Sequence, residues 1–371
     1  MENAIDRMVV DGNNVRNALV AVFALVVGAA MPSFAAERTV SGAYTLTANE
    51  DWTGDSVTLE RGATVDLAGH NLAVGVVALG SGSGTATFTD SSAGTGELRF
   101  TIPSGATFTK TADIAITGNL ALVKDGPGTF LWSGGTLDAA IPITISGGVF
   151  KNGVTTANVF GPSGTITVNG TGQFDLNFRS TNGGASPVLN KTFYIEGDGP
   201  DGSGAIVNTA ASGGYAAHLS HVYMTGDATI GGTARVECRG AGYGISGAGY
   251  TLTVKNTESL VLTSGSTSSK NYITCQKVIC DGGTLQPCQV ASSATVTLTI
   301  TEGVTLKNGG TFDNYAYSGS KNRTQSIAPS ITVSEGGGIL HSSKGWYQLN
   351  GPLTVQTGST LSIPTAAPWY Y

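Results

Sequence analysis

The sequence predicts an all-β fold, a right-handed parallel β-helix in which short strands and tight corners wind into a β-solenoid. Three observations predict it. A nine-residue pattern recurs along the chain, its copies are spaced by a length that suits turns of a solenoid, and the composition is rich in glycine and poor in charge. The right hand follows from the general preference of parallel strands for right-handed crossovers.

The recurring pattern reads apolar, Thr, apolar, two turn residues, Gly, two further residues and apolar. A short β-run, a glycine corner and a second β-run, repeated on one chain, are typical of strand solenoids. The clear copies are VTLERGATV (57–65), FTIPSGATF (100–108), LTITEGVTL (298–306), ITVSEGGGI (331–339) and LTVQTGSTL (353–361), with looser copies at 143–150 and 166–174.

The spacing of the copies indicates the length of one turn. The copies begin at positions 57, 100, 143 and 166, and again at 298, 331 and 353. Most intervals are one or two multiples of a unit of about 22 residues, which suits one turn built from strands of about 4 to 6 residues, so that 36–371 would form about 15 turns. The interval from 298 to 331 is not such a multiple and would need a looped-out insertion. The two-unit intervals leave a β-propeller as the alternative.

Alternation within each copy predicts which residues face the core. Because successive strand side chains point to opposite faces, the two apolar residues of each run share one face and the threonine between them points the other way. Glycine at the corner adopts backbone angles that β-branched residues avoid. The predicted inward residues are Val57, Leu59, Leu298, Ile300, Ile331, Val333, Leu353 and Val355, and the intervening threonines face outward.

The composition supports an all-β chain and excludes several functions. Glycine makes up 54 of 371 residues and only 12% of residues are charged, about twice and about half the usual shares. The formal net charge of −6 provides no basic surface for nucleic acid or anionic lipid. No phosphate loop, nucleophile elbow or dinucleotide fingerprint is present, so we expect no cofactor.

Residues 1–35 have the pattern of a secretory signal peptide. The apolar run ALVAVFALVVGAAM, at 18–31, follows two arginines and precedes the small-residue sequence SFAA at 33–36. This run is too short for a comfortable membrane span and suits a signal peptide, so we expect cleavage after Ala35 and no membrane-spanning helix in the mature chain. The acidic start of the chain is atypical, which leaves an uncleaved N-terminal anchor as the alternative.

The remainder, 36–371, is predicted to be a single β-solenoid. Regular turns are expected over 37–179 and 295–363. In 180–294 the corner motif fades while glycine-rich turns persist between strand-like runs. We interpret this stretch as less regular turns of the same solenoid, with a separate inserted domain as the alternative.

The segment LALVKDGPGTFLWSGG, 120–135, resembles the autotransporter-associated β-strand repeat. The matching positions are Leu122, Lys124, Gly126, Gly128, Thr129, Ser133 and Gly134, with Trp132 where that family usually has leucine. The resemblance is specific over this one segment, and elsewhere it is partial. It implies a bacterial surface passenger built as a parallel β-helix.

One departure from that family concerns the export route. Autotransporters of the classical type end in a barrel of about 12 strands, each of about 10 alternating residues. No such block precedes Tyr371. The alternatives are a fragment of a longer chain, export that ends in the periplasm or medium, or a separate outer-membrane translocator.

Four cysteines, Cys238, Cys275, Cys280 and Cys288, lie in the less regular region. An even number in an exported chain predicts disulfides among them, with three connectivities open, and buried thiols are the alternative. Their spacing does not match the paired spacing of zinc sites.

The histidines give no metal signal. His218 and His221 are three positions apart, and on one strand this spacing would place them on opposite faces. His70 and His341 are isolated in the sequence.

The segment GDGPDGSGA has the composition of a calcium loop. Its candidate ligands are Asp198 and Asp201. Calcium needs six or more oxygen atoms, and no glutamate follows at the spacing of known loops, so we expect a turn and no metal here.

The predicted function is structural display or adhesion at a bacterial surface, without enzymatic activity. Its expected partners are a surface glycan or a host or matrix protein. The alternative is a polysaccharide lyase or hydrolase with a site around residues 196–240, because such enzymes cluster carboxylates and basic groups on one face of a β-helix. The candidates there are Asp198, Asp201, Asp227, Arg235, Glu237 and Arg239. The two hypotheses share one fold, so the fold cannot separate them.

Overall fold

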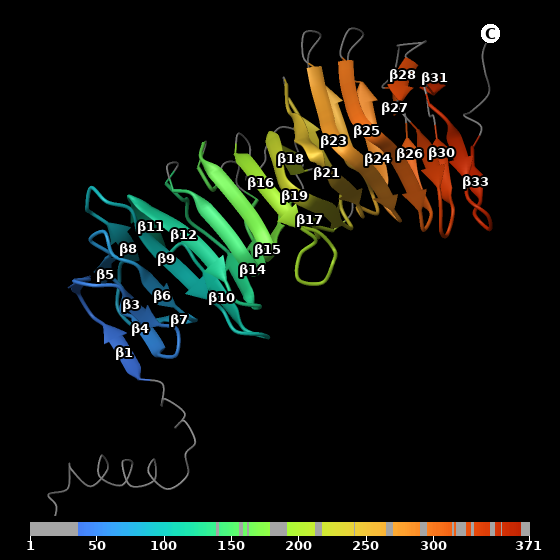
Figure 1. Ribbon diagram of the computed structural model, residues 1–371. Helices are drawn as coiled ribbons and strands as arrows, with labels where there is room; N and C mark the ends of the chain where they lie inside the picture. The colour runs from blue at the N-terminus through green and yellow to red at the C-terminus, as the bar shows by residue number, and fades with distance from the viewer. Residues whose placement is uncertain are drawn as a thin grey trace, which may run out of the picture. The chain divides into compact units, whose positions relative to one another are not determined.

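The fold consists of β-strands that stack turn upon turn (Figure 1). The structure is a computed structural model that describes residues 36–364, apart from 139–140, 156–158, 162, 179–190, 212–216, 241, 265–269, 290–294, 314, 317–323, 328–329, 342–345 and 350. The predicted signal segment, 1–35, lies outside the described residues. All regular structure in the described part is β-strand.

A long parallel sheet runs through the whole stack and supplies one wall of the solenoid. Its path is β3 (Glu50–Trp52), β6 (Leu72–Val74), β9 (Gly96–Thr101), β12 (Leu120–Asp125), β14 (Ile143–Asn152), β15 (Thr165–Asp175), β16 (Thr192–Gly197), β19 (His221–Gly232), β21 (Gly244–Val254), β23 (Lys270–Asp281), β25 (Thr295–Lys307), β29 (Ile331–Val333) and β32 (Leu353–Val355). Three further strands pair beside it: β10 (Thr107–Lys110), β13 (Thr129–Trp132) and β17 (Ile206–Asn208).

The other walls change along the chain. The N-terminal turns have two further parallel sheets, one of β1 (Glu37–Val40), β4 (Ser56–Leu59) and β7 (Val77–Leu79), the other of β2 (Ala43–Thr45), β5 (Thr64–Asp66), β8 (Ala86–Asp90) and β11 (Ile114–Gly118). The later turns have one, with β18 (Ala217–Leu219), β20 (Val236–Arg239), β22 (Leu260–Ser264), β24 (Thr284–Gln289), β26 (Gly310–Asp313), β27 (Tyr315–Ala316), β30 (Gly338–His341) and β33 (Leu361–Ser362). A separate pair joins β28 (Thr324–Ile327) to β31 (Trp346–Leu349).

Parallel pairing between successive turns confirms the predicted β-solenoid and excludes a propeller, whose blades would need antiparallel neighbours. Leu122 pairs with Ile143, whereas Phe193 pairs with Val222, so the second of these turns is several residues longer than the first. The turn length therefore varies, and the described main path has fewer strands than the 15 or so turns expected from a constant unit. Within the described residues, the path of paired strands passes through the less regular region by way of β16, β19, β21 and β23.

The corner glycines of the repeated motif have the predicted backbone conformation. In the five clear copies the φ angles are 87° at Gly62, 74° at Gly105, 101° at Gly303, 74° at Gly336 and 81° at Gly358. These positive values are strained for residues that carry a Cβ. Gly62, Gly105, Gly336 and Gly358 lie in turns between strands, whereas Gly303 lies at a register shift inside the continuous strand β25. The motif therefore marks a corner in four copies and an irregularity within a strand in the fifth.

The expectation that all copies of the motif occupy equivalent places in successive turns is partly wrong. Val57 lies in β4 and Phe100 in β9, which belong to different sheets, so the interval between them does not measure two turns of one wall. The long interval from Leu298 to Ile331 needs no insertion of the expected kind, because Val304 pairs with Ile331. The second half of one copy thus pairs with the first half of the next. This shift by half a motif keeps apolar residues in the core, because inward and outward residues alternate in the same way in both halves.

Most of the predicted inward residues form the core. Val57, Leu59, Ile300, Ile331 and Val333 are at most 4% exposed, and Leu298 is partly buried against them.

The prediction fails in the last copy, where Leu353 and Val355 are 39% and 45% exposed. Their strand, β32, is the last of the described main path. No further described turn covers it, and a core position needs a neighbouring turn on both sides.

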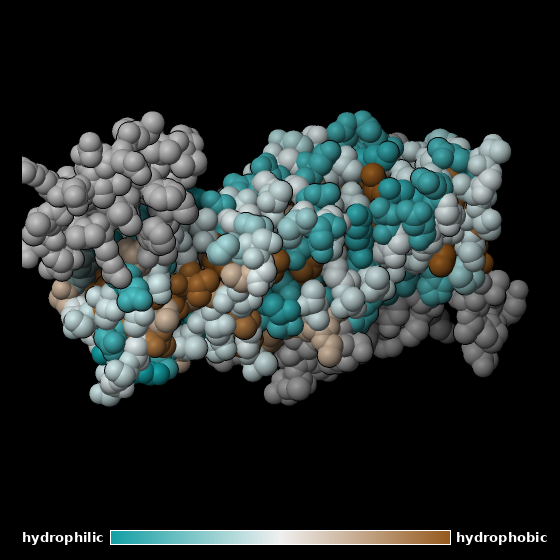
Figure 2. Space-filling model, turned by 90° about the horizontal axis from the view of Figure 1, so that it is seen from below, coloured by the Kyte–Doolittle hydropathy of each residue, from teal (hydrophilic) through white to brown (hydrophobic). Residues whose placement is uncertain are grey.

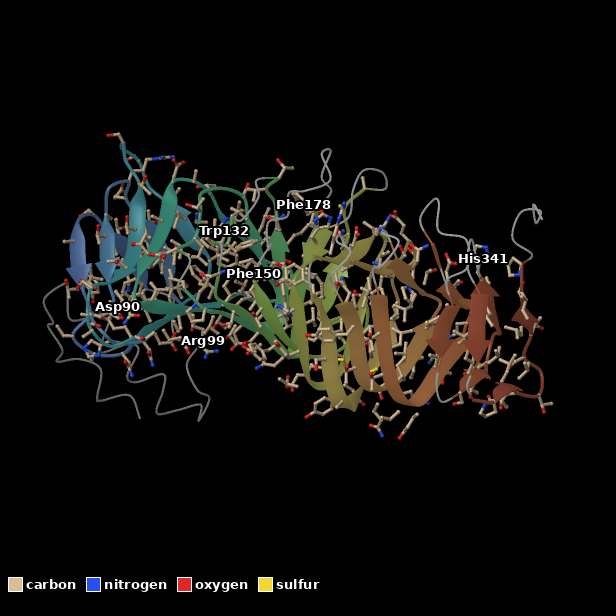
Figure 3. The ribbon with its side chains drawn as sticks, turned by 90° about the horizontal axis from the view of Figure 1, so that it is seen from above. Asp90, Arg99, Trp132, Phe150, Phe178 and His341 are labelled. Atoms are coloured by element: carbon tan, nitrogen blue, oxygen red, sulfur yellow. The ribbon has the colours of Figure 1, made fainter. Side chains whose placement is uncertain are left out.

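Aromatic rings fill the middle of the core. Phe130 and Phe150 stack with their centroids 4.9 Å apart, and Phe174 follows 5.5 Å from Phe150. The Trp132 ring lies 6.3 Å from Phe150, and both side chains lie in the packed interior (Figure 3). Parallel register brings the same strand position of each turn into one column, so similar residues recurring at that position stack. Hydrophilic and intermediate residues predominate on the face seen in Figure 2.

Buried polar side chains donate hydrogen bonds to backbone carbonyls at several corners. The ammonium group of Lys124 donates to the carbonyl oxygens of Asp125, Gly126 and Gly147 at 2.8–2.9 Å. Asn208 is likewise fully buried and donates to two corner carbonyls. Unpaired carbonyls in a dry interior would be costly. Lys124 therefore has a structural role at a corner.

Candidate functional site

The exposed aromatic side chains of the described residues gather on three consecutive strands of the main sheet. Tyr194 on β16 is 36% exposed, and Tyr223 on β19 and Tyr250 on β21 are each 37% exposed. Tyr194 and Tyr223 point outward because their strand neighbours, such as Phe193 and Val222, are buried in the core. We call the outward residues Tyr194, Glu196, His221, Tyr223, Thr225, Asp227, Ser246 and Tyr250 the tyrosine face.

Register brings the rings of this face together. Tyr194 pairs with Tyr223 on the next turn, and their rings stack with centroids 5.5 Å apart and planes 23° apart. His221, two positions before Tyr223 on β19, has its ring 6.3 Å away at 20°. The Tyr243 ring meets the His221 ring edge-on at 5.1 Å. Three nearly parallel rings thus lie side by side on the outer wall.

The next turn contributes small residues. Gly244 is the register partner of His221, and Ser246 is that of Tyr223. The stack of register-paired tyrosine rings therefore ends at β19, and a further ring, Tyr272 of β23, lies close enough to interact electrostatically with Tyr223.

Polar side chains follow the rings along the same strands. The Thr225 hydroxyl lies 3.2 Å from Glu196 Oε2 and 3.3 Å from the carbonyl oxygen of Ile195. Asp227 Oδ1 accepts a hydrogen bond from the Thr251 backbone at 2.8 Å. Both carboxylates immediately precede the register pair Gly197–Ala228, so they occur at equivalent points of adjacent turns.

A second polar cluster lies on another wall, on β18 and β20. His218 Nε2 lies 3.8 Å from Glu237 Oε2, and Arg235 Nη2 lies 3.6 Å from the same oxygen. The His218 and Glu237 side chains are only 4% and 5% exposed. Burial lowers the pKa of the His218 imidazole, against the opposing effect of Glu237. This arrangement joins a carboxylate with an imidazole and a guanidinium group, a combination that can support acid–base chemistry.

The structure separates the carboxylates that the sequence grouped as catalytic candidates. Glu237 meets Arg235 on one wall, whereas Asp227 lies on the main sheet and Asp198 and Asp201 lie in the turn between β16 and β17. Arg239 ends β20 and acts electrostatically on the cluster around Glu237.

The calcium-like segment is a hydrogen-bonded turn. Hydrogen bonds from Ser203 hold the pKa of the Asp201 carboxyl below its usual value, and Gly204 donates its amide to the Asp198 carbonyl at 2.8 Å. Across the described residues, no group of three or more His, Cys, Asp or Glu side chains could hold a metal ion.

The cysteines differ from the predicted disulfides. Cys238, Cys275 and Cys280 are free, buried thiols, so no bridge joins these three. Their side chains fill core positions, and burial raises the pKa of each thiol to about 12. The side chain of Cys288 lies outside the described residues. These three cysteines match the alternative prediction, which was buried thiols.

The histidines occupy different surroundings from those expected. His218 and His221 lie on two strands of different sheets, β18 and β19, because the chain turns a corner between them. His341, which is isolated in the sequence, has its Nδ1 atom 3.1 Å from Asp313 Oδ1 on the preceding turn. His70 is half-buried.

Sequence reasoning missed the tyrosine face and the His218–Glu237 pair. The strand-like runs KTFYIEG and HLSHVYM did carry a signal, since the alternation that buries Phe193 and Val222 must expose Tyr194 and Tyr223. What the sequence lacked was the register between turns that pairs the two tyrosines.

Comparisons with protein-family models, curated proteins and solved structures find no match to this chain. Within the part of the chain that the structure describes, no helix is long and apolar enough to cross a membrane. The fold therefore defines the class of the protein, a parallel β-solenoid.

Proposed function

We propose that the protein is an exported bacterial surface β-solenoid with a role in display or adhesion, similar to an autotransporter passenger. The observation that carries the proposal is the tyrosine face, a group of exposed, stacked rings on the outer wall of a repetitive scaffold. Solenoids use such extended walls for binding. The signal-like sequence of 1–35 and the repeat-like sequence of 120–135 agree with this proposal, and a right-handed winding remains expected.

Export is tested by expressing the full chain in a Gram-negative host, with or without a co-expressed translocator. The mature N-terminus is measured by mass spectrometry, and surface exposure by antibody labelling of intact cells. The proposal expects cleavage after Ala35 and labelling at the surface. A cytosolic chain that still begins at Met1 would overturn it.

Adhesion is tested on cells that display the protein. Their attachment to immobilised glycans and matrix proteins should exceed that of cells without it. If the cells are labelled at the surface but attach no better, the adhesion hypothesis is rejected and the display hypothesis is kept.

The alternative is a carbohydrate-active β-helix with its site at the buried cluster on β18 and β20. The His218–Glu237 pair favours it, because a buried imidazole beside a carboxylate can transfer a proton. Depolymerisation of polysaccharides is the measurement. Product that disappears in Glu237→Gln and persists in Glu335→Gln, a change at an exposed residue, would establish the alternative.

A further inference from the structure

The tyrosine face has one ring that is stacked on one side and bordered by a small residue on the other. Tyr223 lies in register between Tyr194 on β16 and Ser246 on β21. Tyr194 stacks against one side of the Tyr223 ring. A serine side chain is too short to cover an aromatic ring, and Tyr223 stays 37% exposed. Ser246 therefore does not cover the side of the Tyr223 ring toward β21, and Tyr272, the register partner of Gly244 on β23, borders that side and interacts electrostatically with Tyr223.

Further along the same strands, the wall carries hydrogen-bonding groups of the kind that bind hydroxyl groups. Glu196 and Asp227 supply carboxylate oxygens from adjacent turns, each with one neighbour already hydrogen-bonded to it. His221 Nδ1 is buried and has no hydrogen-bond partner among the described residues. A carboxylate has about four acceptor positions, so each retains capacity for a ligand.

This combination identifies the chemistry of the ligand. A pyranose ring has a C–H face that packs on an aromatic ring, whose face is electron-rich, and a rim of hydroxyl groups that donate to carboxylates. An acidic glycan would be repelled by Glu196, Asp227 and the net charge of −6. A purely apolar peptide would leave the two carboxylates desolvated without partners. A neutral sugar satisfies both parts of the face.

The stacked rings set the direction of a bound polymer. Because Tyr194 of the neighbouring turn covers one face of the Tyr223 ring, the faces of this ring are turned along the stack. A pyranose ring stacked on Tyr223 is parallel to it, so its chain runs across the stack, along the strands of the wall.

We propose that the tyrosine face binds a neutral polysaccharide, with one pyranose ring stacked on Tyr223 over Ser246. The inference rests on the proposed surface function and names the ligand class of its binding wall. It involves no bond cleavage, and it places binding on a different wall from the His218–Glu237 cluster.

The test measures binding of cello-oligosaccharide and manno-oligosaccharide hexamers, with an oligogalacturonate hexamer as the acidic probe, by titration calorimetry on the processed full chain. Tyr223→Ala should weaken binding roughly tenfold, a loss of about 1.4 kcal/mol. Tyr223→Phe retains the ring and should bind within about threefold of the wild type.

Ser246→Tyr gives a second, independent variant. It extends the stacked rings onto β21 and occupies the proposed sugar position, so it should abolish binding while keeping the fold. Thr332→Tyr is the matched control, since it adds a tyrosine to an outward position of β29 on the same wall and should leave binding unchanged. Circular dichroism and melting temperature confirm that each variant is folded.

The inference is overturned by three outcomes: no neutral hexamer binds, the acidic hexamer binds best, or binding is the same in Tyr223→Ala and Ser246→Tyr as in the wild type. Failure of the inference is distinguishable from failure of the surface function. Surface labelling and cell attachment that persist in Tyr223→Ala would keep the surface function and remove only the sugar site.

Discussion

Truncating one ring of the aromatic core should destabilise the solenoid by several kcal/mol. Phe150 is fully buried and touches four other rings, those of Phe130, Trp132, Phe160 and Phe174, at centroid distances of 4.9 to 6.3 Å. A phenylalanine buries at least about 150 Å², which at about 25 cal/mol per Å² is roughly 4 kcal/mol. Phe150→Ala should therefore lower the free energy of unfolding by about 3 to 5 kcal/mol.

The assay is urea unfolding of the processed chain, followed by tryptophan fluorescence, because Trp132 lies 6.3 Å from Phe150. The control is Val149→Ala on the same strand, whose side chain points to the opposite face and which should cost under about 1 kcal/mol. Equal losses in the two variants would refute the inward orientation of Phe150. Phe150→Leu should fall between them.

Three further predictions concern buried polar and glycine positions. Burial lowers the pKa of Lys124 to about 8. Between this value and the ordinary lysine pKa of 10.5, Lys124 is protonated in the unfolded chain and deprotonated in the folded chain. The free energy of unfolding of the wild type should therefore rise with pH relative to that of Lys124→Met. Urea unfolding at several pH values measures this difference, and the absence of a trend would mean that the corner carbonyls keep the lysine charged. Gly128→Ala should destabilise, because its Cβ would clash with the backbone oxygen of Pro103, and an unchanged melting temperature would contradict that clash. Cys238, Cys275 and Cys280, with thiol pKa values of about 12, should resist a maleimide reagent in the native protein and react after unfolding, as counted by mass spectrometry.

The stacked geometry explains why the protein can use few charges. Neighbouring turns satisfy each other's backbone groups, and buried side chains such as Lys124 and Asn208 donate hydrogen bonds to further backbone carbonyls. The outer walls are therefore free to carry residues for binding. The tyrosine face and the His218–Glu237 cluster occupy two different walls of the same few turns, so binding and any chemistry can be altered separately.

The sequence by itself determined the local geometry. Alternation of apolar residues with threonine and the glycine at each corner depend only on residues within one motif, because side-chain direction and backbone conformation are local properties. Val57 and Leu59 were correctly assigned to the core, and Gly62 to a corner, for this reason. The solenoid follows from the repetition of that unit.

The tertiary structure alone decided which turns face each other. The turn from Leu122 to Ile143 is shorter than the turn from Phe193 to Val222, and this register is set by how the turns pack, not by any one motif. The position of β32 at the end of the described main sheet leaves Leu353 exposed. The register also brought Tyr194 onto Tyr223 from one turn to the next, a contact that no local pattern specifies.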